Sequence, residues 1–276
     1  MSYEQSVGLP DLAKSPGQYE YFLRSVCKTY YEGAPWIIIS YKGQRDSRGN
    51  RHGVGIAKYQ DADVYVGIWR NGKMDGKGVY KYTDGTYEGD WKNGVKEGKG
   101  KFTDALGIGV SRRPTGARYE GEYKNDRKHG RGTMVYKDGG KYVGEWVAGN
   151  REGRGIMEYN DGYRYDGGWV AGKREGSGIL TWHNGSYVGG WREDKKHGYG
   201  TMVYTDGTYV GKWGAGNREG HGIFIYKDGN KYEGEWKNDY REGKGKITYN
   251  DGTKYNGDWV AGKREGCGVF TYKDTQ

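Results

Sequence analysis

Basic side chains recur at one position of this 276-residue chain, and an acid or a histidine directly follows most of them, as in Arg151-Glu152 and Lys196-His197. A column of cations could bind acidic phospholipid or an acidic protein. Alternating charges would instead compensate each other on the surface within a Debye length of about 8–10 Å. Both interpretations stay open. The candidate lipid- or partner-binding residues in this column are Arg151, Arg174, Arg218, Arg241 and Arg264.

The other residues capable of chemistry form no recognisable catalytic or metal-binding pattern. The five histidines make no HxxxH or HExxH motif, and no CxxC pair occurs. The acids recur in register, which is typical of solvated rather than catalytic carboxylates. The many Gly-x-Gly pairs lack the context of a nucleotide-binding loop. We therefore expect a non-enzymatic protein without catalytic, metal or cofactor-binding residues.

A repeat of 22 or 23 residues positions these side chains. Each copy begins with Tyr-x-Gly-x-Trp, continues through a polar stretch to Gly-x-Gly, and then alternates apolar and polar residues up to a turn that is often Asp-Gly. One copy, Tyr119–Tyr123, ends in tyrosine instead of tryptophan, and a degenerate copy begins at Tyr41. The nine clear copies begin at Tyr65, Tyr87, Tyr119, Tyr142, Tyr165, Tyr187, Tyr209, Tyr232 and Tyr255.

The alternation predicts two β-strands per repeat, because residues i, i+2 and i+4 of a strand share one face. Asp-Gly is a strong tight-turn signal. The chain holds 54 Gly, 28 Tyr and 10 Trp, so we expect an all-β protein whose core is made of rings. In this interpretation the indole fills the space beside each glycine pair.

The pattern resembles the MORN repeat family, whose motif reads close to YEGEWKNGKRHGKGVYTYADG. The segment Tyr232-Glu-Gly-Glu-Trp-Lys-Asn238 is nearly identical to its first part. The resemblance implies an elongated antiparallel meander of MORN β-hairpins. It also implies a scaffold for protein interactions in a cytoskeletal assembly, as in radial-spoke and axonemal members or protist cytoskeletal members. The alternative that it implies is a phospholipid-binding tether between membrane and cytoskeleton.

Two regions are expected. Residues 1–40 form an N-terminal segment with a short helix at about 16–30, because Ser15-Pro16-Gly17-Gln18 is typical of a helix start. This helix would cap the first strand edge or dock a partner. Residues 41–276 form the array, with one degenerate and nine clear repeats.

An insertion at about 106–118 expands the second clear repeat. It contains Arg112, Arg113 and Arg118 and no acid. It is either a solvated basic loop or a contact for an acidic partner or a lipid headgroup.

The last strand predicted in the array carries apolar residues at Val269, Phe270 and Tyr272. Unpaired strand edges recruit strands from other chains. We expect this edge to dock against a second copy, as a homodimer, or against a partner protein.

The net charge, the cysteines and the first residues bear on nucleic-acid binding and on the cellular compartment of the protein. The net charge is +9, but the aromatic residues are needed for the core, so we expect no nucleic-acid binding. Cys27 and Cys267 make no disulfide framework, and the first ten residues lack the pattern of a signal peptide. We therefore expect a cytoplasmic protein, and the resemblance to the MORN repeat family implies that it lies in the cytoskeleton, in particular in the axoneme of a cilium or flagellum.

Overall fold

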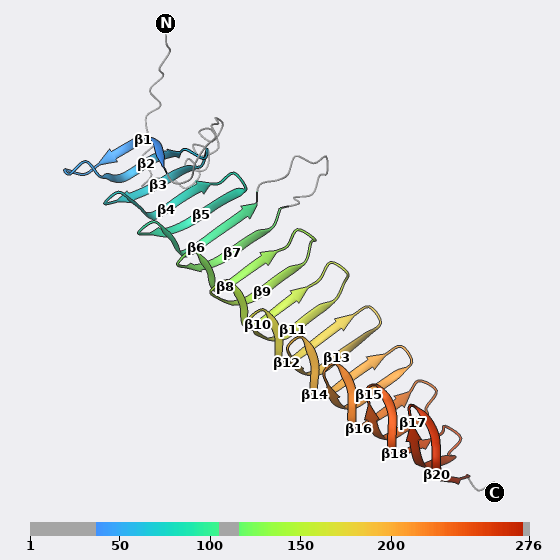
Figure 1. Cartoon of the computed structure of the whole chain (residues 1–276). Coiled ribbons are helices and arrows are strands. Elements are labelled where there is room, and N and C mark those ends of the chain that lie inside the picture. The colour runs from blue at the N-terminus through green and yellow to red at the C-terminus, as the bar shows by residue number, and fades with distance from the viewer. Residues whose placement is uncertain (1–36, 105–115, 273–276) are drawn as a thin grey trace. The chain divides into compact units, whose positions relative to one another are not determined.

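The computed structural model describes residues 37–104 and 116–272, and every regular element within those ranges is a β-strand (Figure 1). The helix expected at about 16–30 lies outside the described residues. So do Arg112 and Arg113. Arg118, which we had assigned to the insertion, is the first residue of a strand and pairs with Thr103.

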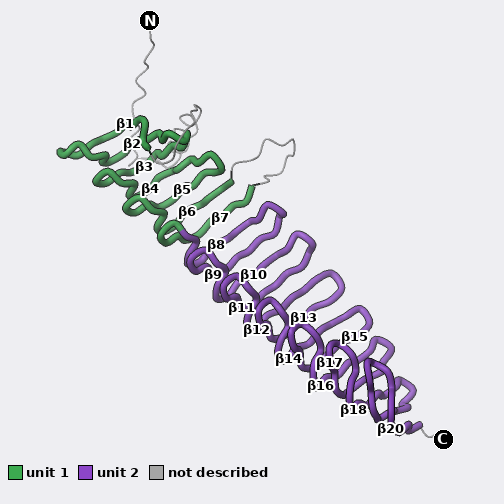
Figure 2. The backbone as a smooth tube through the Cα atoms, viewed as in Figure 1, with its two compact units in different colours: residues 1–126 green, residues 127–276 purple. Residues whose placement is uncertain are grey.

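The chain divides into two compact units, with the boundary in the sequence between Asp126 and Arg127 (Figure 2). The first unit contains seven strands: β1 (Ile38–Arg45), β2 (Arg51–Tyr59), β3 (Val64–Arg70), β4 (Lys73–Lys81), β5 (Gly85–Lys92), β6 (Val95–Asp104) and β7 (Arg118–Lys124).

The second unit contains thirteen strands. They are β8 (Arg127–Val135), β9 (Lys141–Val147), β10 (Asn150–Glu158), β11 (Arg164–Val170), β12 (Lys173–Trp182), β13 (Gly185–Arg192), β14 (Lys195–Tyr204), β15 (Gly207–Gly214), β16 (Asn217–Tyr226), β17 (Lys231–Lys237), β18 (Tyr240–Thr248), β19 (Lys254–Val260) and β20 (Lys263–Thr271).

Within each unit every strand pairs antiparallel with the next strand along the chain, which confirms the predicted meander. The repeat that begins at Tyr142 shows the register. Gly144 of β9 lies opposite Gly155 of β10, and Gly155 lies opposite Gly167 of β11. Glycines therefore face one another across successive strands, while a β-bulge follows Gly153, whose φ is +60°.

A buried tyrosine covers the two facing glycines of its own hairpin. Tyr142 has no exposed surface, and a Cβ added to Gly144 or Gly155 would overlap its ring. The ring makes T-shaped contacts with Trp146 of its own repeat, at 5.1 Å between centroids, and with Trp169 of the next, at 5.4 Å. Its hydroxyl donates a hydrogen bond to the carbonyl of Glu145, and burial raises its pKa. The same arrangement recurs at Tyr165, Tyr187, Tyr209 and Tyr232.

The sequence predicts that a tryptophan fills the space beside each glycine pair, but the structure places the tyrosine there instead. The indole of Trp169 lies beside the tyrosine ring and donates its Nε1–H to the carbonyl of Gly155, at 3.1 Å. The prediction was wrong because strand alternation identifies the face on which a ring lies, not the neighbour that it contacts. The indole instead links each repeat to the one before it.

Replacing Gly155 with alanine should destabilise the protein because the Tyr142 ring must move to admit a Cβ. Overpacking of this kind lowers the free energy of unfolding by up to about 3 kcal/mol. Gly149 is the matched control, since its φ is +94° and a Cβ there would meet no atom within 4 Å. Gly149→Ala should cost only about 1 kcal/mol of backbone strain. Chemical denaturation measures both, and equal losses would contradict the ring-on-glycine contact.

Candidate functional site

The cation column lies against the aromatic core instead of extending freely into solvent. The guanidinium of Arg151 is 4.1 Å from the ring centroid of Trp169, in the next repeat. The side chains of Arg174 and Arg218 are only 20% and 19% exposed. Four of the five arginines in our candidate set occupy this position over the next indole: Arg151, Arg174, Arg218 and Arg241.

Each arginine and the glutamate after it hold the turn of the following repeat, an arrangement that we name the turn clamp. Arg151 donates from Nη2 to the carbonyl of Gly172, at 2.6 Å, and accepts at its own carbonyl from Gly172 N–H, at 2.9 Å. Glu152 accepts from Ala171 N–H, at 2.9 Å. Ala171 has a φ of 48°, so the clamp holds a left-handed turn in place.

A second form of the clamp occurs where the turn contains aspartate. Arg174 Nε donates to Asp194 Oδ1, at 3.0 Å, and Arg174 Nη2 donates to the Asp194 carbonyl, at 2.9 Å. Arg218 and Asp239 repeat this geometry. The positive charges that we considered for lipid binding therefore have partners inside the array.

The Lys196-His197 pair departs from the clamp. Lys196 lies over Trp213, at 3.9 Å, and among the described residues no acceptor receives a hydrogen bond from its ammonium. His197 stands where glutamate stands in most copies, and among the described contacts Ala215 N–H donates no hydrogen bond to its side chain. The turn at Ala215-Gly216 keeps the backbone hydrogen bond that Gly216 N–H donates to the Lys196 carbonyl, at 2.9 Å.

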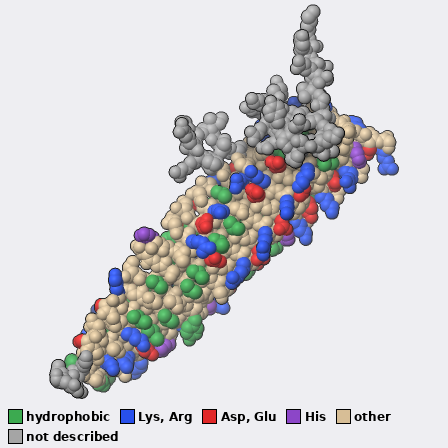
Figure 3. All heavy atoms as spheres, turned by 180° about the vertical axis from the view of Figure 1, so that it is seen from behind, with side chains coloured by type: hydrophobic (Ala, Val, Ile, Leu, Met, Phe, Trp, Pro, Cys, Tyr) green, Lys and Arg blue, Asp and Glu red, His purple; other side chains and the backbone are tan. Residues whose placement is uncertain are grey.

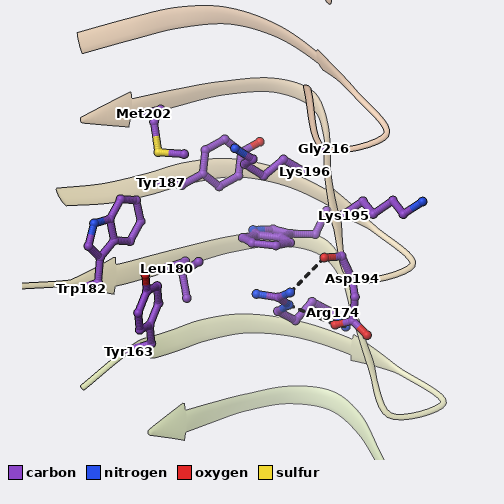
Figure 4. A pocket seen from close by; sticks show the side chains of 11 residues that line it. Tyr163, Arg174, Leu180, Trp182, Tyr187, Asp194, Lys195, Lys196, Met202 and Gly216 are labelled. Atoms are coloured by element: carbon purple, nitrogen blue, oxygen red, sulfur yellow. Dashed lines mark hydrogen bonds and ion pairs between the residues drawn. The ribbon is translucent and has the colours of Figure 1, made fainter. Parts of the chain in front are cut away.

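A pocket of about 390 Å³ opens beside Lys196, entirely within the second unit. Trp182 and Tyr163 form one wall, with ring centroids 5.8 Å apart and planes at 20°. Leu180 and Met202 lie between that wall and Lys196, as Figure 4 shows. Four repeats have phenylalanine or tyrosine at this position, and the narrower side chains of Leu180 and Met202 leave more room than those rings would.

Sequence reasoning missed these residues because it treated every repeat as the same. Comparison of the repeats with one another would have marked them. Tyr163 stands where Gly140, Asn230 and Thr253 stand in other copies, and Trp182 stands where most copies have tyrosine.

The opposite face carries an aliphatic patch over β12–β16. In one row across these strands, Ile179, Val188, Thr201, Val210 and Ile223 lie directly opposite one another. We define the outer aliphatic patch as five side chains that are 40–48% exposed: Ile179, Val188, Val203, Val210 and Ile225. On the face drawn in Figure 3, exposed hydrophobic side chains gather toward the C-terminal end.

Ion pairs lie on both sides of this patch. Arg164 pairs with Asp166 on β11, at 3.1 Å, and Lys231 pairs with Glu233 on β17, at 2.9 Å. Asp166 and Glu233 belong to the same row as the aliphatic residues. The patch is therefore an apolar centre with a charged rim, which is typical of protein interfaces.

The other candidate residues are exposed. Arg118 begins β7. Arg264 lies over Phe270, at 5.1 Å, and donates to the hydroxyl of Tyr249, at 3.1 Å. Val269 and Phe270 belong to β20, with 67% and 43% of their surface exposed, and Tyr272 follows the strand, 73% exposed.

The described ranges offer neither a metal site nor a membrane-spanning helix. Residues 37–104 and 116–272 contain no cluster of three His, Cys, Asp or Glu able to hold a metal ion. The same residues include no helix long and apolar enough to cross a membrane.

Hairpins of one repeated pattern, joined by rings and clamps, define a tandem β-repeat protein. Nine stretches match the MORN repeat, and together they cover more than half of the chain, which therefore belongs to the MORN-repeat family. This family is of the non-catalytic scaffold type, and its repeats serve as protein-interaction or membrane-binding modules. The matched residues are 65–86, 87–105, 119–141, 142–162, 165–186, 187–208, 209–231, 232–254 and 255–275.

Comparison with curated protein sequences gives no match. Two solved structures are similar to part of the chain. The TCP10 domain of Danio rerio CPAP, in complex with a STIL peptide, is 11% identical with a TM-score of 0.35, over 85% of this chain and 100% of that one. The SAS-4 (dCPAP) TCP domain of Drosophila melanogaster, in complex with a proline-rich motif of Ana2, is 10% identical with a TM-score of 0.31, over 76% and 99%. Scores this low carry no argument about fold or function.

Removing one clamp should weaken the contact between neighbouring repeats. Met74 occupies the cation position in its own repeat and is buried there, so Arg151→Met introduces a side chain that this position accepts. We expect a loss of about 2 kcal/mol in the free energy of unfolding, from the cation–π contact and the hydrogen bond. Arg154→Met, at an exposed position, should change it by less than about 0.5 kcal/mol. Equal effects in chemical denaturation would show that the clamp contributes nothing.

Lys196 gives the protein a pH-dependent stability. Burial, opposed by Asp239 and reinforced by Arg218, lowers the pKa of its ammonium to about 8. Arg174 of the preceding repeat and Asp194 of the same repeat line the pocket as well, and burial raises the pKa of Tyr187, which stays neutral. A lysine in an unfolded chain titrates near pH 10.4. Between about pH 8 and this value, the unfolded chain holds a proton that the folded chain has released, so stability rises with pH.

Lys196→Met removes this titration. Relative to that variant, the wild type should gain stability between about pH 8 and about pH 10. Melting temperatures at several pH values measure the difference, with exposed Lys195→Met as the control. A difference that stays constant with pH would contradict the buried ammonium.

Proposed function

We propose that this chain is a non-enzymatic scaffold that binds other proteins in a cytoskeletal assembly, specifically an axonemal assembly of the radial-spoke kind. The observation that carries the proposal is the outer aliphatic patch on β12–β16. Monomeric proteins rarely expose large contiguous apolar areas unless a partner covers them. The ion pairs on β11 and β17 supply the polar rim of such an interface.

The construction of the array supports a scaffolding role. Each tyrosine contacts the tryptophan of the next repeat, and each turn clamp holds the next turn. The hairpins of the second unit are therefore tied to one another at both the ring and the turn. Binding residues on different hairpins of that unit keep a fixed spacing, which a scaffold requires.

The clamp also weighs against the phospholipid alternative. Membrane-binding basic segments depend on clustered cations that are free to meet headgroups. Arg151, Arg174, Arg218 and Arg241 instead donate to backbone carbonyls of the following turns. Arg112, Arg113 and Arg118 stay candidates for an acidic partner or a headgroup.

The β20 edge is a second proposed contact. Among the described strands, β20 pairs with β19, and all its residues are exposed. Val269, Phe270 and Tyr272 add apolar surface to this edge. We propose that it docks a second copy of the chain or a partner protein, two cases that light scattering of the purified chain distinguishes.

Charges placed in the outer aliphatic patch should abolish partner binding without unfolding the protein. The double variant Val188→Asp/Val210→Asp puts two carboxylates at the centre of the patch, on exposed positions. We expect its co-sedimentation with axonemal fractions to weaken about tenfold or more. Val143→Asp is the matched control, since Val143 occupies the same register and face but lies outside the patch.

Co-pelleting of the protein with phosphoinositide vesicles tests the phospholipid alternative. Vesicle binding that is lost when the clamp arginines are neutralised, together with no axonemal co-sedimentation, would replace the scaffold by the membrane tether.

A further inference from the structure

Four departures from the repeat pattern meet at one place in the second unit. Tyr163 and Trp182 add aromatic surface, while Lys196 and His197 remove the clamp from the turn at Ala215-Gly216. In other repeats an arginine and a glutamate stand where Lys196 and His197 stand and hold the next turn, so this pair gives up hydrogen bonds that the array uses elsewhere. Such a loss beside added rings and a cavity is what a binding site would require.

The cavity has two chemically different sides. On one side, the stacked rings of Tyr163 and Trp182 and the side chains of Leu180 and Met202 offer apolar surface. On the other, Lys196 brings an ammonium to the pocket (Figure 4). A volume of about 390 Å³ lies at the small end of the range for ligand pockets, about 300–1,000 Å³, and suits one large side chain with its neighbours.

The charges in the pocket leave one cation available for a ligand. Asp194 accepts from Arg174 at its carboxylate and at its carbonyl, so the charge of that guanidinium already has an anionic partner. Lys195 points away from the other side chains in Figure 4. Lys196 has no hydrogen-bond acceptor among the described residues. A half-buried ammonium without an acceptor is costly, and an incoming carboxylate would offset that cost.

We propose that this pocket binds an aromatic or aliphatic side chain flanked by carboxylates, presented by an acidic segment of a partner protein. The inference rests on the proposed protein-binding function and assigns it a second contact, on the face opposite the outer aliphatic patch. The segment's apolar side chain packs against Trp182, Leu180 and Met202, and a neighbouring carboxylate accepts a hydrogen bond from Lys196 Nζ.

The pKa of Lys196, about 8, is low because burial outweighs the attraction of Asp239, which agrees with an ammonium that has no hydrogen-bonded anion among the described residues. An acidic segment is favoured over a membrane, because one recessed cation between rings does not form the clustered basic surface that headgroups require. The net charge of +9 further favours an acidic partner.

The test uses three blocked pentapeptides and the full chain. The probe has the sequence Asp-Glu-Phe-Asp-Glu, one control replaces Phe by Gly, and the other replaces the acids by their amides. We expect the probe to shift the indole NMR signal of Trp182, and each control to bind about tenfold more weakly or worse. No shift with the probe, or equal binding of all three peptides, would overturn the proposal.

Two variants test the role of Lys196. Lys196→Met, which copies Met74, should reduce probe affinity about tenfold, whereas Lys195→Met should leave it unchanged. The double variant Lys196→Arg/His197→Glu rebuilds the clamp. It should raise the melting temperature of the protein and lower its affinity for the probe. Melting curves identify a variant that fails to fold, and the peptide comparison on the wild type decides the question without any variant.

The outcomes separate this proposal from the function on which it rests. Axonemal co-sedimentation without probe binding would overturn the proposed peptide site but support the scaffold function. Probe binding without co-sedimentation would support the peptide site but overturn the axonemal assignment. Acidic vesicles that shift the Trp182 indole, where the probe does not, would assign the pocket to a lipid headgroup instead.

Discussion

A tyrosine ring lying on two facing glycines is the contact on which the rest of this structure depends. The glycines have no Cβ, so the ring reaches the backbone of both strands. The ring then contacts the indoles of its own repeat and of the next, and therefore joins hairpins that share few aliphatic side chains. Each repeat contacts its neighbours in this way, so stability accumulates from nearest-neighbour terms, as in other repeat proteins.

The same geometry determines where the arginine side chains lie. A row of indoles, one per repeat, creates a surface on which the guanidinium of the preceding repeat can lie flat, with its donors directed at the next turn. The positive charge counted from the sequence is therefore only partly available to ligands. Most of the arginine column acts inside the protein, and protein contacts are left to the outer aliphatic patch and to the few positions where the pattern breaks.

Regularity makes those breaks informative. A side chain that stabilises the next repeat in most copies, and that is replaced in one, has given up a known contact at that place. At Lys196 and His197 the loss of the side-chain hydrogen bonds of the clamp coincides with added aromatic surface and a cavity. Natural proteins tend to violate their own local rules at functional sites, which is why this pocket, and not the many regular positions, carries the binding inference.

The sequence by itself determined the period, the strands, the turns and the ring-based core, because strand alternation and turn chemistry are local properties of the chain. It could not determine that tyrosine rather than tryptophan covers the glycine pair, since both rings share one face and only packing decides which contacts which. The sequence also could not determine whether the side chains of Arg151 and its equivalents extend into solvent or lie against the core. An arginine side chain is compatible with either, and the indole that receives it belongs to the next repeat. The tertiary structure alone brought Tyr163, Trp182 and Lys196 together, because strand register places residues from three different strands and turns around one cavity.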